Sequence, residues 1–226
     1  KRKATFNKAP MFYDFSKRTI DIVGSAFALI IFSPVIIIFA LLVKLTSFGP
    51  IFYTPQRVGK DGRLFKMLKF RSMRMYKING KIVHAQKYLE ITPKLKKEYQ
   101  ENSYKLTHDP RITPIGKILR RLSIDELPQL INVLIGDMSL VGPRAYQNDE
   151  LNHQQKVYPQ TSKYVKIILN ARPGASGQWQ VSGRSFINFD KRVAMDAAYV
   201  KRRSIIYDLY IMIKTPFAML IGTGAV

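Results

Sequence analysis

The most constraining feature of this sequence is a run of 22 residues without a charge, from Ile22 to Val43. A helix of that length can cross the roughly 30 Å hydrocarbon core of a bilayer. The run is too long for the apolar region of a cleaved signal peptide, and no small-residue cleavage site follows it. We therefore predict a membrane helix near the start of the chain.

Ser33 and Pro34 interrupt this run near its middle. Proline lacks the N–H of a helical hydrogen bond and clashes with the preceding turn, so it kinks or breaks a helix. Basic residues mark the cytoplasmic side of a membrane, and they flank the run at both ends, with Lys17 and Arg18 before it and Lys44 after it. The pattern fits a re-entrant hairpin and a single kinked span equally well. In a hairpin, the Ser33 hydroxyl, other backbone groups or a water must satisfy the carbonyls freed at the bend.

The charge balance limits the choice of partners. The chain has 37 Lys and Arg against 15 Asp and Glu, so its surface attracts polyanions such as anionic lipid, phosphorylated substrates or nucleic acid. No recognition helix or RNA-binding aromatic motif is visible, and we expect no nucleic-acid partner. The absence of cysteine excludes thiolate nucleophiles and cysteine-based metal sites.

We expect a mixed α/β, mainly helical fold with three parts. Residues 1–16 form an interfacial segment, residues 17–48 the membrane segment, and residues 49–226 a compact domain. Turn residues and hydrophobic periodicity predict its elements. The first expected elements are short strands over 50–75 around a turn at 59–62, and a helix broken near Pro93 within 84–107. Helices over 114–122 and 125–135 follow. The last are a loop with a short extended stretch over 171–186 and one or two amphipathic helices over 189–221. The apolar stripe of this last segment fits core packing or the membrane interface.

Asp125 and Glu126 form a doubled carboxylate in a chain with few acids. One reading is structural, because Ser123 and Glu126 have the spacing of a helix capping box. The other reading is catalytic, with one carboxylate attacking phosphorus and the other holding a metal or orienting a water. Arg120 and Arg121, just before the pair, would then neutralise phosphate oxygens, and Mg²⁺ would reduce the repulsion between carboxylate and pyrophosphate.

Three glycine-containing turns are candidate phosphate sites. Gly142-Pro143-Arg144 and Ser182-Gly183-Arg184 each present an arginine on a turn, and Pro173-Gly174 is a similar turn. Glycine allows backbone N–H groups to approach a phosphate closely. Each turn is a weak signal by itself, and the sequence contains no Walker A pattern.

Several long motifs together resemble the bacterial sugar transferases, or monotopic phosphoglycosyl transferases. They are KRTID with the membrane run, QRVGKDGRLFKMLKFRSM, DPRITPIGKILRRLSIDELPQLINVLIGDMSLVGPR, and PGASGQWQVSGR. The resemblance extends from Lys17 to the C-terminus and is weak over about 77–107. Two departures are Ala145, where the family usually has proline, and Ala175 with Ser176 in place of a β-branched residue and threonine.

The resemblance implies a mechanism as well as a topology. Ser33-Pro34 matches the break of the family's re-entrant helix, which favours the hairpin and a monotopic position on the cytoplasmic face. Residues 17–48 would then be a re-entrant membrane helix, and residues 49–226 a cytosolic catalytic domain with membrane-associated helices. Asp125 would attack the β-phosphate of a UDP-sugar and release UMP, and polyprenyl phosphate would take the phosphosugar. Glu126 would help with Mg²⁺ or proton handling. Arg120 matches a phosphate-contacting arginine, and Arg144 one that contacts the nucleotide.

Further expectations concern partners and alternatives. Anionic phospholipid, downstream glycosyltransferases and a second copy of the chain are the additional partners that we consider. Many relatives carry extra membrane spans before this region, so the chain is expected to be a short form or a catalytic fragment. The alternative function is a non-catalytic membrane scaffold with the same fold. The WQVSGR form weakly favours glucose or galactose as the sugar.

Overall fold

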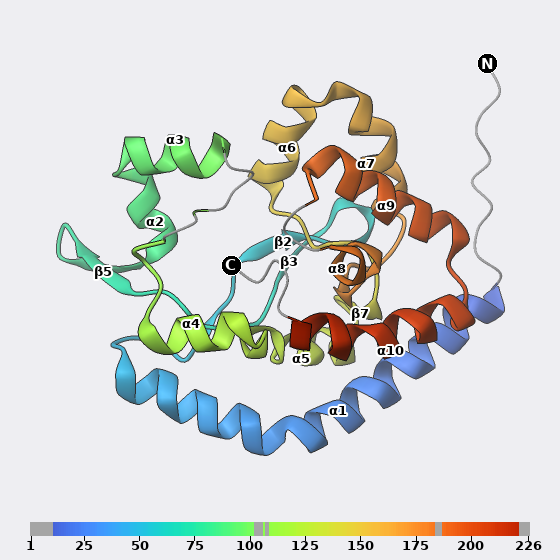
Figure 1. Ribbon diagram of the computed structural model, residues 1–226, viewed down its shortest axis with the longest axis horizontal. Coiled ribbons are helices and arrows are strands. Elements are labelled where there is room, and N and C mark those ends of the chain that lie inside the picture. The colour runs from blue at the N-terminus through green and yellow to red at the C-terminus, as the bar shows by residue number, and fades with distance from the viewer. Residues whose placement is uncertain (1–10, 102–105, 107–108, 184–186, 222–226) are drawn as a thin grey trace.

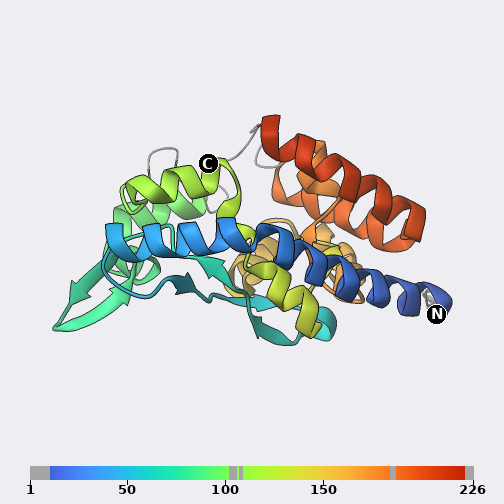
Figure 2. The same ribbon diagram turned by 90° about the horizontal axis from the view of Figure 1, so that it is seen from below.

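The computed structural model describes residues 11–101, 106, 109–183 and 187–221. A long helix, α1 (Met11–Thr46), runs along one side of the molecule and is visibly bent (Figure 1). Helices α4, α5 and α10 lie next to α1, and the short strands and other helices lie on their far side, as the two views together show (Figures 1 and 2). The fold is mixed α/β and mostly helical, as predicted from the sequence.

Helix α1 includes Pro34 and continues without interruption over 36 residues. Pro34 leaves the carbonyl of Ile30 without its usual helical donor, and the Ser33 hydroxyl donates to this carbonyl at 2.8 Å. Of the groups expected to satisfy a carbonyl freed at the bend, the Ser33 hydroxyl is the one observed at Ile30. Two separate helices joined by a break are not observed, and the re-entrant topology stays a prediction. The helix begins at Met11, so it includes part of the predicted interfacial segment.

Short strands follow α1 as predicted. β1 (Phe52–Tyr53) pairs antiparallel with β4 (Lys69–Phe70), and β2 (Gln56–Val58) pairs antiparallel with β3 (Leu64–Lys66) around the turn η1 (Lys60–Gly62). The buried Arg71 joins this region to α1, because it donates hydrogen bonds to the carbonyls of Ser47 and Phe48 just beyond the helix end.

A small lobe follows β4. It consists of the antiparallel hairpin β5 (Met75–Ile78) and β6 (Lys81–His84), then α2 (Ala85–Glu90) and α3 (Pro93–Glu101). The break before Pro93 was predicted, but the hairpin was not. Its turn is Asn79-Gly80, and both residues have positive φ, 49° and 75°. Asn-Gly is the strongest short sequence signal for a two-residue hairpin turn, so this hairpin was predictable.

Helix α4 (Pro114–Arg121) matches its prediction, and the Thr113 side chain caps it by accepting from Gly116 N at 2.9 Å. The next predicted helix begins too early. Residues 124–126 form a 3₁₀ turn, η2 (Ile124–Glu126), and α5 spans Gln129–Ile135 with Pro128 at its N-cap. Proline is tolerated in the first turn of a helix but removes a hydrogen bond in its interior, which explains why α5 begins after Pro128. Gly136 ends α5 with φ 99°, as predicted.

The chain then forms a compact helical layer. β7 (Ser139–Val141) pairs parallel with β8 (Gly174–Ser176). Between and after these strands lie α6 (Asn148–Val157), η3 (Pro159–Thr161), α7 (Ser162–Ile168), α8 (Gln178–Ser182), α9 (Phe189–Arg202) and α10 (Ile205–Ile221). The short extended stretch and the two terminal helices were predicted, whereas α6, α7 and α8 were not. The largest core cluster lies between α6, α7 and α9.

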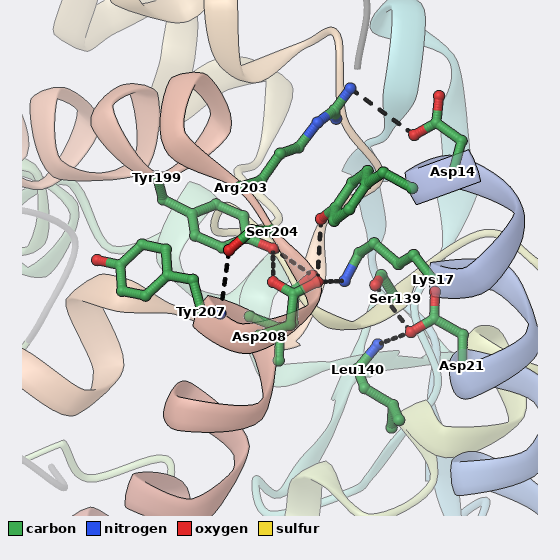
Figure 3. Close-up of polar contacts among 12 residues, drawn as sticks. Asp14, Lys17, Asp21, Ser139, Leu140, Tyr199, Arg203, Ser204, Tyr207 and Asp208 are labelled. Atoms are coloured by element: carbon green, nitrogen blue, oxygen red, sulfur yellow. Dashed lines mark hydrogen bonds and ion pairs between the residues drawn. The ribbon is translucent and has the colours of Figure 1, made fainter. Parts of the chain in front are cut away.

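Two buried carboxylates fasten the first half of α1 to the rest of the fold (Figure 3). Asp208 of α10 accepts from Tyr13 at 2.9 Å, from Lys17 at 2.8 Å, and from Tyr199 of α9 at 2.5 Å. Asp21 of α1 accepts from the hydroxyl of Ser139 and the N–H of Leu140, both at 2.9 Å and both in β7. Helix α1 is therefore part of the folded unit and not a detached anchor.

The outer side of α1 remains exposed and apolar. Within the described part of the chain, Phe12–Thr46 is the helix long and apolar enough to cross a membrane. Helix α10 also exposes apolar side chains, with Ile206 82% and Ile213 67% accessible, so the stripe predicted there points outward and not into the core. Exposed apolar residues on α4 and α5 extend this surface (Ile118, Leu122, Ile131 and Ile135).

Candidate active site

Asp125 and Glu126 lie in the 3₁₀ turn between α4 and α5. The turn begins at Ser123, which adopts a left-handed conformation with φ 55° and whose side chain makes no capping hydrogen bond. The capping box predicted from Ser123 and Glu126 is therefore wrong. A capping box requires an extended residue followed by a regular helix, and Pro128 prevents a regular helix from starting here.

The two carboxylates have different surroundings. Asp125 is buried, and only 12% of its side chain is accessible, whereas 44% of the Glu126 side chain is accessible. Burial raises the pKa of Asp125 to about 6, with Glu126 adding to the rise and Lys69 and Arg120 opposing it. A carboxyl group with a pKa near 6 is ionised at neutral pH, which a nucleophile requires.

Lys69 of β4 binds both carboxylates. Its ammonium nitrogen lies 2.6 Å from Glu126 Oε1 and 4.0 Å from Asp125 Oδ2. Lys69 was not singled out from the sequence. Its position within the motif KFRSM was the signal that could have identified it.

The two predicted arginines of α4 have different positions. Arg120 is half-buried, donates from Nε to the hydroxyl of the buried Ser72 at 3.0 Å, and acts electrostatically on Asp125. Arg121 is exposed. Adjacent helical residues point about 100° apart, so the two guanidinium groups leave the helix in different directions. The structure thus brings Arg120, but not Arg121, toward the carboxylate pair.

One side of the pair lies toward the apolar helix α1. Ile124, next to Asp125, belongs to an apolar cluster with the buried residues Val43, Phe70 and Leu119 and with several residues of the second half of α1. The acidic turn therefore lies directly beside the helix that is apolar enough to enter a bilayer. A lipid held along α1 would have a short path to Asp125.

Arg144 lies in a second polar cluster. Burial lowers its pKa, but nearby acids outweigh this effect and raise it, and they include Glu150 and Glu126. Its guanidinium lies 4.9 Å from the Trp179 ring centroid, and that of Arg192 lies 5.5 Å from the same ring. Arg144 therefore interacts electrostatically with Glu126 of the acidic pair. A small pocket borders it, lined by Val58, Gly59, Pro143, Tyr146, Leu151, Ile168, Leu169, Ala171 and Pro173.

The glycine turns serve packing and do not present free N–H groups. Gly142 N–H donates to the Ser176 carbonyl and Gly174 N–H to the Pro143 carbonyl, both at 2.9 Å. A Cβ on Gly174 would lie 2.1 Å from Gly142 N, so only glycine allows this backbone contact. The prediction that the amide of Pro173-Gly174 approaches a phosphate is therefore wrong. Arg184, the last predicted arginine, lies outside the described residues.

The side chain of Asp196 holds the turn that carries Arg144. Its carboxylate accepts from the backbone N–H of Arg144 at 3.0 Å, and it is fully buried. Burial raises the pKa of Asp196 to about 7, although this hydrogen bond and Arg192 oppose the rise. Arg192 is also buried and lies 3.7 Å from Glu150. None of these three side chains was singled out from the sequence, because α9 reads as an ordinary amphipathic helix.

Comparison with known proteins decides the family. The model of the family described as bacterial sugar transferase matches residues 12–222. The chain belongs to the bacterial sugar transferase family. It is 46% identical over 93% of its length to the undecaprenyl-phosphate galactose phosphotransferase of Salmonella typhimurium, where the match covers 42% of that protein. It is 39% identical over 93% of its length to the exopolysaccharide production protein ExoY of Rhizobium meliloti, covering 88% of that protein.

A third relative is named for a different sugar. The chain is 35% identical over 92% of its length to the UDP-glucose:undecaprenyl-phosphate glucose-1-phosphate transferase of Escherichia coli, and the match covers 41% of that protein. The resemblance inferred from the motifs is confirmed, and so is the enzyme class of phosphoglycosyl transferase. The chain matches less than half of the two transferases named for galactose and glucose.

Asp125 and Glu126 are the hard oxygen ligands that a magnesium site in this sugar transferase would use. Among the described residues, no group of three or more His, Asp and Glu side chains could hold a metal ion. Mg²⁺ in phosphoryl-transfer sites is held by one or two carboxylates with substrate phosphates and waters. The pair fits that requirement. The ammonium group of Lys69 contacts both carboxylates, so a positive charge is stabilised at this position.

Proposed function

We propose that this sugar transferase moves a sugar 1-phosphate from a UDP-sugar to a polyprenyl phosphate at the cytoplasmic face of the membrane. The names of two relatives, which specify undecaprenyl phosphate with galactose or glucose, support this substrate pair. The observation that carries the proposal is the buried, ionisable Asp125 between Lys69 and Arg120, with Ile124 packed on α1.

The first step uses Asp125 as the nucleophile. Its carboxylate oxygen attacks the β-phosphorus of the UDP-sugar, the bond to the bridging oxygen breaks, and UMP leaves with that oxygen. The product is an aspartyl-phosphosugar ester. Arg120 and Lys69 neutralise charge on the phosphate oxygens, which is the main requirement of phosphoryl transfer.

The second step regenerates the enzyme. A phosphate oxygen of the polyprenyl phosphate attacks the phosphorus of the ester, the Asp125–phosphorus bond breaks, and a polyprenyl-diphosphosugar forms. Asp125 and Glu126 would hold Mg²⁺, which supplies charge neutralisation for the diphosphate. Arg144, which interacts electrostatically with Glu126, would contact the nucleotide.

Topology forms part of the proposal. The bend of α1, the Ser33 hydrogen bond and the basic flanks support a re-entrant helix that enters and leaves on one face. The exposed apolar residues of α10 support an interfacial position for that helix, beside anionic phospholipid.

One experiment tests the nucleophile. The protein is incubated with a UDP-sugar and Mg²⁺ without acceptor, and digests are searched by mass spectrometry for a hexose phosphate on the peptide that contains Asp125. We expect the adduct in the parent and not in Asp125→Asn, which should also release no UMP on full turnover. UMP release by Asp125→Asn at the parent's rate would overturn the assignment.

A further inference from the structure

Three sides of Asp125 can be distinguished by what surrounds them. Ile124 and the residues of α1 in its cluster form the apolar side, and the second side is that of Glu126, which interacts electrostatically with Arg144. The third side is formed by Lys69 and by what stands next to it on the sheet. The sugar of the donor is bonded to the phosphate that Asp125 attacks, so the sugar must occupy one of these three sides.

The third side is built from aromatic residues. Tyr53 of β1 is the cross-strand partner of Lys69 in β4. Directly opposed residues point to the same face of a sheet, with Cβ atoms about 4.5–5.5 Å apart. Tyr53 therefore stands beside the lysine that binds both carboxylates. The neighbouring pair, Phe52 and Phe70, points to the opposite face and stacks there at 5.4 Å.

His84 adds a second ring to this third side. It is the last residue of β6 in the small lobe, and its ring stacks on Tyr53 with centroids 3.8 Å apart and an interplanar angle of 9°. Burial lowers the pKa of His84 to about 4, with Arg111, Arg71 and Arg120 adding to the effect. His84 is therefore neutral at physiological pH, and a neutral imidazole has one donor and one acceptor nitrogen.

Arg120 links this stack to the reacting phosphate. It acts electrostatically on Asp125, on Tyr53 and on His84. The stack is thus within range of the same guanidinium that faces the acidic pair. Aromatic side chains with a few fixed polar groups are the usual lining of a site for a small ligand, and here the polar groups are a phenol and a neutral imidazole.

We propose that the Tyr53–His84 stack contacts the sugar of the nucleotide-sugar donor and determines which hexose is accepted. This inference rests on the proposed function. The two rings provide apolar surface for the C–H face of a pyranose, and their hydroxyl and nitrogen atoms distinguish an axial from an equatorial hydroxyl. A site that hydrogen-bonds a substrate hydroxyl rejects an analogue in which the bond cannot form.

The stack also gives the small lobe a role. Among the contacts described here, the Tyr53–His84 stack joins β1, beside the acidic pair, to β6 of the lobe. The lobe is the region where the motifs are weakest, at about 77–107. Variation in the lobe would therefore change the sugar site while the reacting groups stay the same.

The test measures how well each variant discriminates between sugar donors. UMP release is measured with UDP-glucose, UDP-galactose, UDP-N-acetylglucosamine and UDP-N-acetylgalactosamine for the parent, His84→Ala and Tyr53→Leu. We expect the ratio of kcat/KM between the best donor and its C4 epimer to change by about tenfold in both variants. The inhibition constant of UMP, which carries no sugar, should stay within about twofold of the parent.

Two matched controls separate contact from packing. Phe52→Leu alters the opposite face of β1, and Tyr76→Leu removes a stack with Tyr88 inside the lobe, where the rings are 4.3 Å apart. Both should leave the donor ratio within about twofold. If either stack variant unfolds, Tyr53→Phe, which removes only the hydroxyl, and His84→Asn, which removes the ring but keeps a donor and an acceptor, replace it.

The outcomes are distinct. Unchanged donor ratios in the folded stack variants would overturn the sugar assignment. A tenfold increase in the inhibition constant of UMP would overturn it as well, because it would place the nucleotide on the stack. Failure of the parent to release UMP from any of the four donors would instead overturn the proposed function, and the sugar assignment with it.

Discussion

Replacing the nucleophile should stabilise the protein. Asp125 is buried, and burial raises its pKa from the ordinary value of 3.8 to about 6. The folded state therefore binds this proton more tightly than the unfolded state, and the contribution to stability is lost as the pH rises through the folded pKa. Asparagine has nearly the same shape as the neutral carboxyl and carries no charge to desolvate.

The size of the effect follows from the shift. About two pKa units at 1.36 kcal/mol per unit correspond to about 3 kcal/mol at pH 8, where the parent carries the charged group in both states. A difference of this size raises the unfolding temperature by about 6–12 °C in a chain of this length. At pH 4.5 the folded carboxyl is protonated, and about one third of the difference should remain.

The assay is thermal unfolding of the purified protein in detergent at the two pH values, followed by the fluorescence of Trp179. Glu126→Gln is the matched control, because 44% of the Glu126 side chain is accessible and it forms the short ion pair with Lys69. We expect no stabilisation from this control. Equal unfolding temperatures of Asp125→Asn and the parent at pH 8, or a gain that does not depend on pH, would refute the reasoning.

The remaining predictions address catalysis and topology. The parent's kcat/KM for UMP release should fall about tenfold per pH unit below about pH 6, as Asp125 becomes protonated, and a flat profile from pH 5 to 8 would contradict this. Lys69→Met should lower kcat/KM by about 10²-fold. Lys66→Met, at the exposed lysine of β3, should leave kcat/KM unchanged. Ser33→Ala should destabilise the protein by about 1–3 kcal/mol in thermal unfolding, and Ser33→Thr, which keeps the hydroxyl, by less. Because the chain has no cysteine, Asp14→Cys and Thr46→Cys can each be labelled with an impermeant maleimide, and the re-entrant topology requires both to react only from the cytoplasmic side.

Local signals predicted part of the secondary structure. Proline and glycine placed the break before Pro93, the end of α5 at Gly136 and the turn at 59–62, because each of these residues restricts the backbone directly. No element was predicted for the region of α6 and α7, and one further failure arose where two signals competed. At residues 123–128 the capping-box spacing and Pro128 demanded different helix starts, and the proline determined the outcome.

The site was predictable only where its residues are adjacent in sequence. Asp125, Glu126 and Arg120 lie within seven positions of one another, so a motif could identify them together. Lys69 and Asp196 reach the site from β4 and α9, and their roles depend on pairing and packing between distant segments. No sequence periodicity encodes those contacts. The glycines of the 142–144 and 173–177 turns were misread for the same reason, since their partners are each other.

The surroundings of Asp125 reconcile two requirements that oppose each other. A carboxylate attacks phosphorus better when little water must be removed from it, but burial without compensation would keep it protonated and inactive. Packing of Ile124 on α1 removes water, while Lys69 and Arg120 favour the charged form, and the resulting pKa of about 6 leaves the group both ionised and poorly hydrated at neutral pH. Because α1 supplies the packing and β4 the charge, a mutation in either distant segment should change the reactivity of Asp125 without touching the substrate.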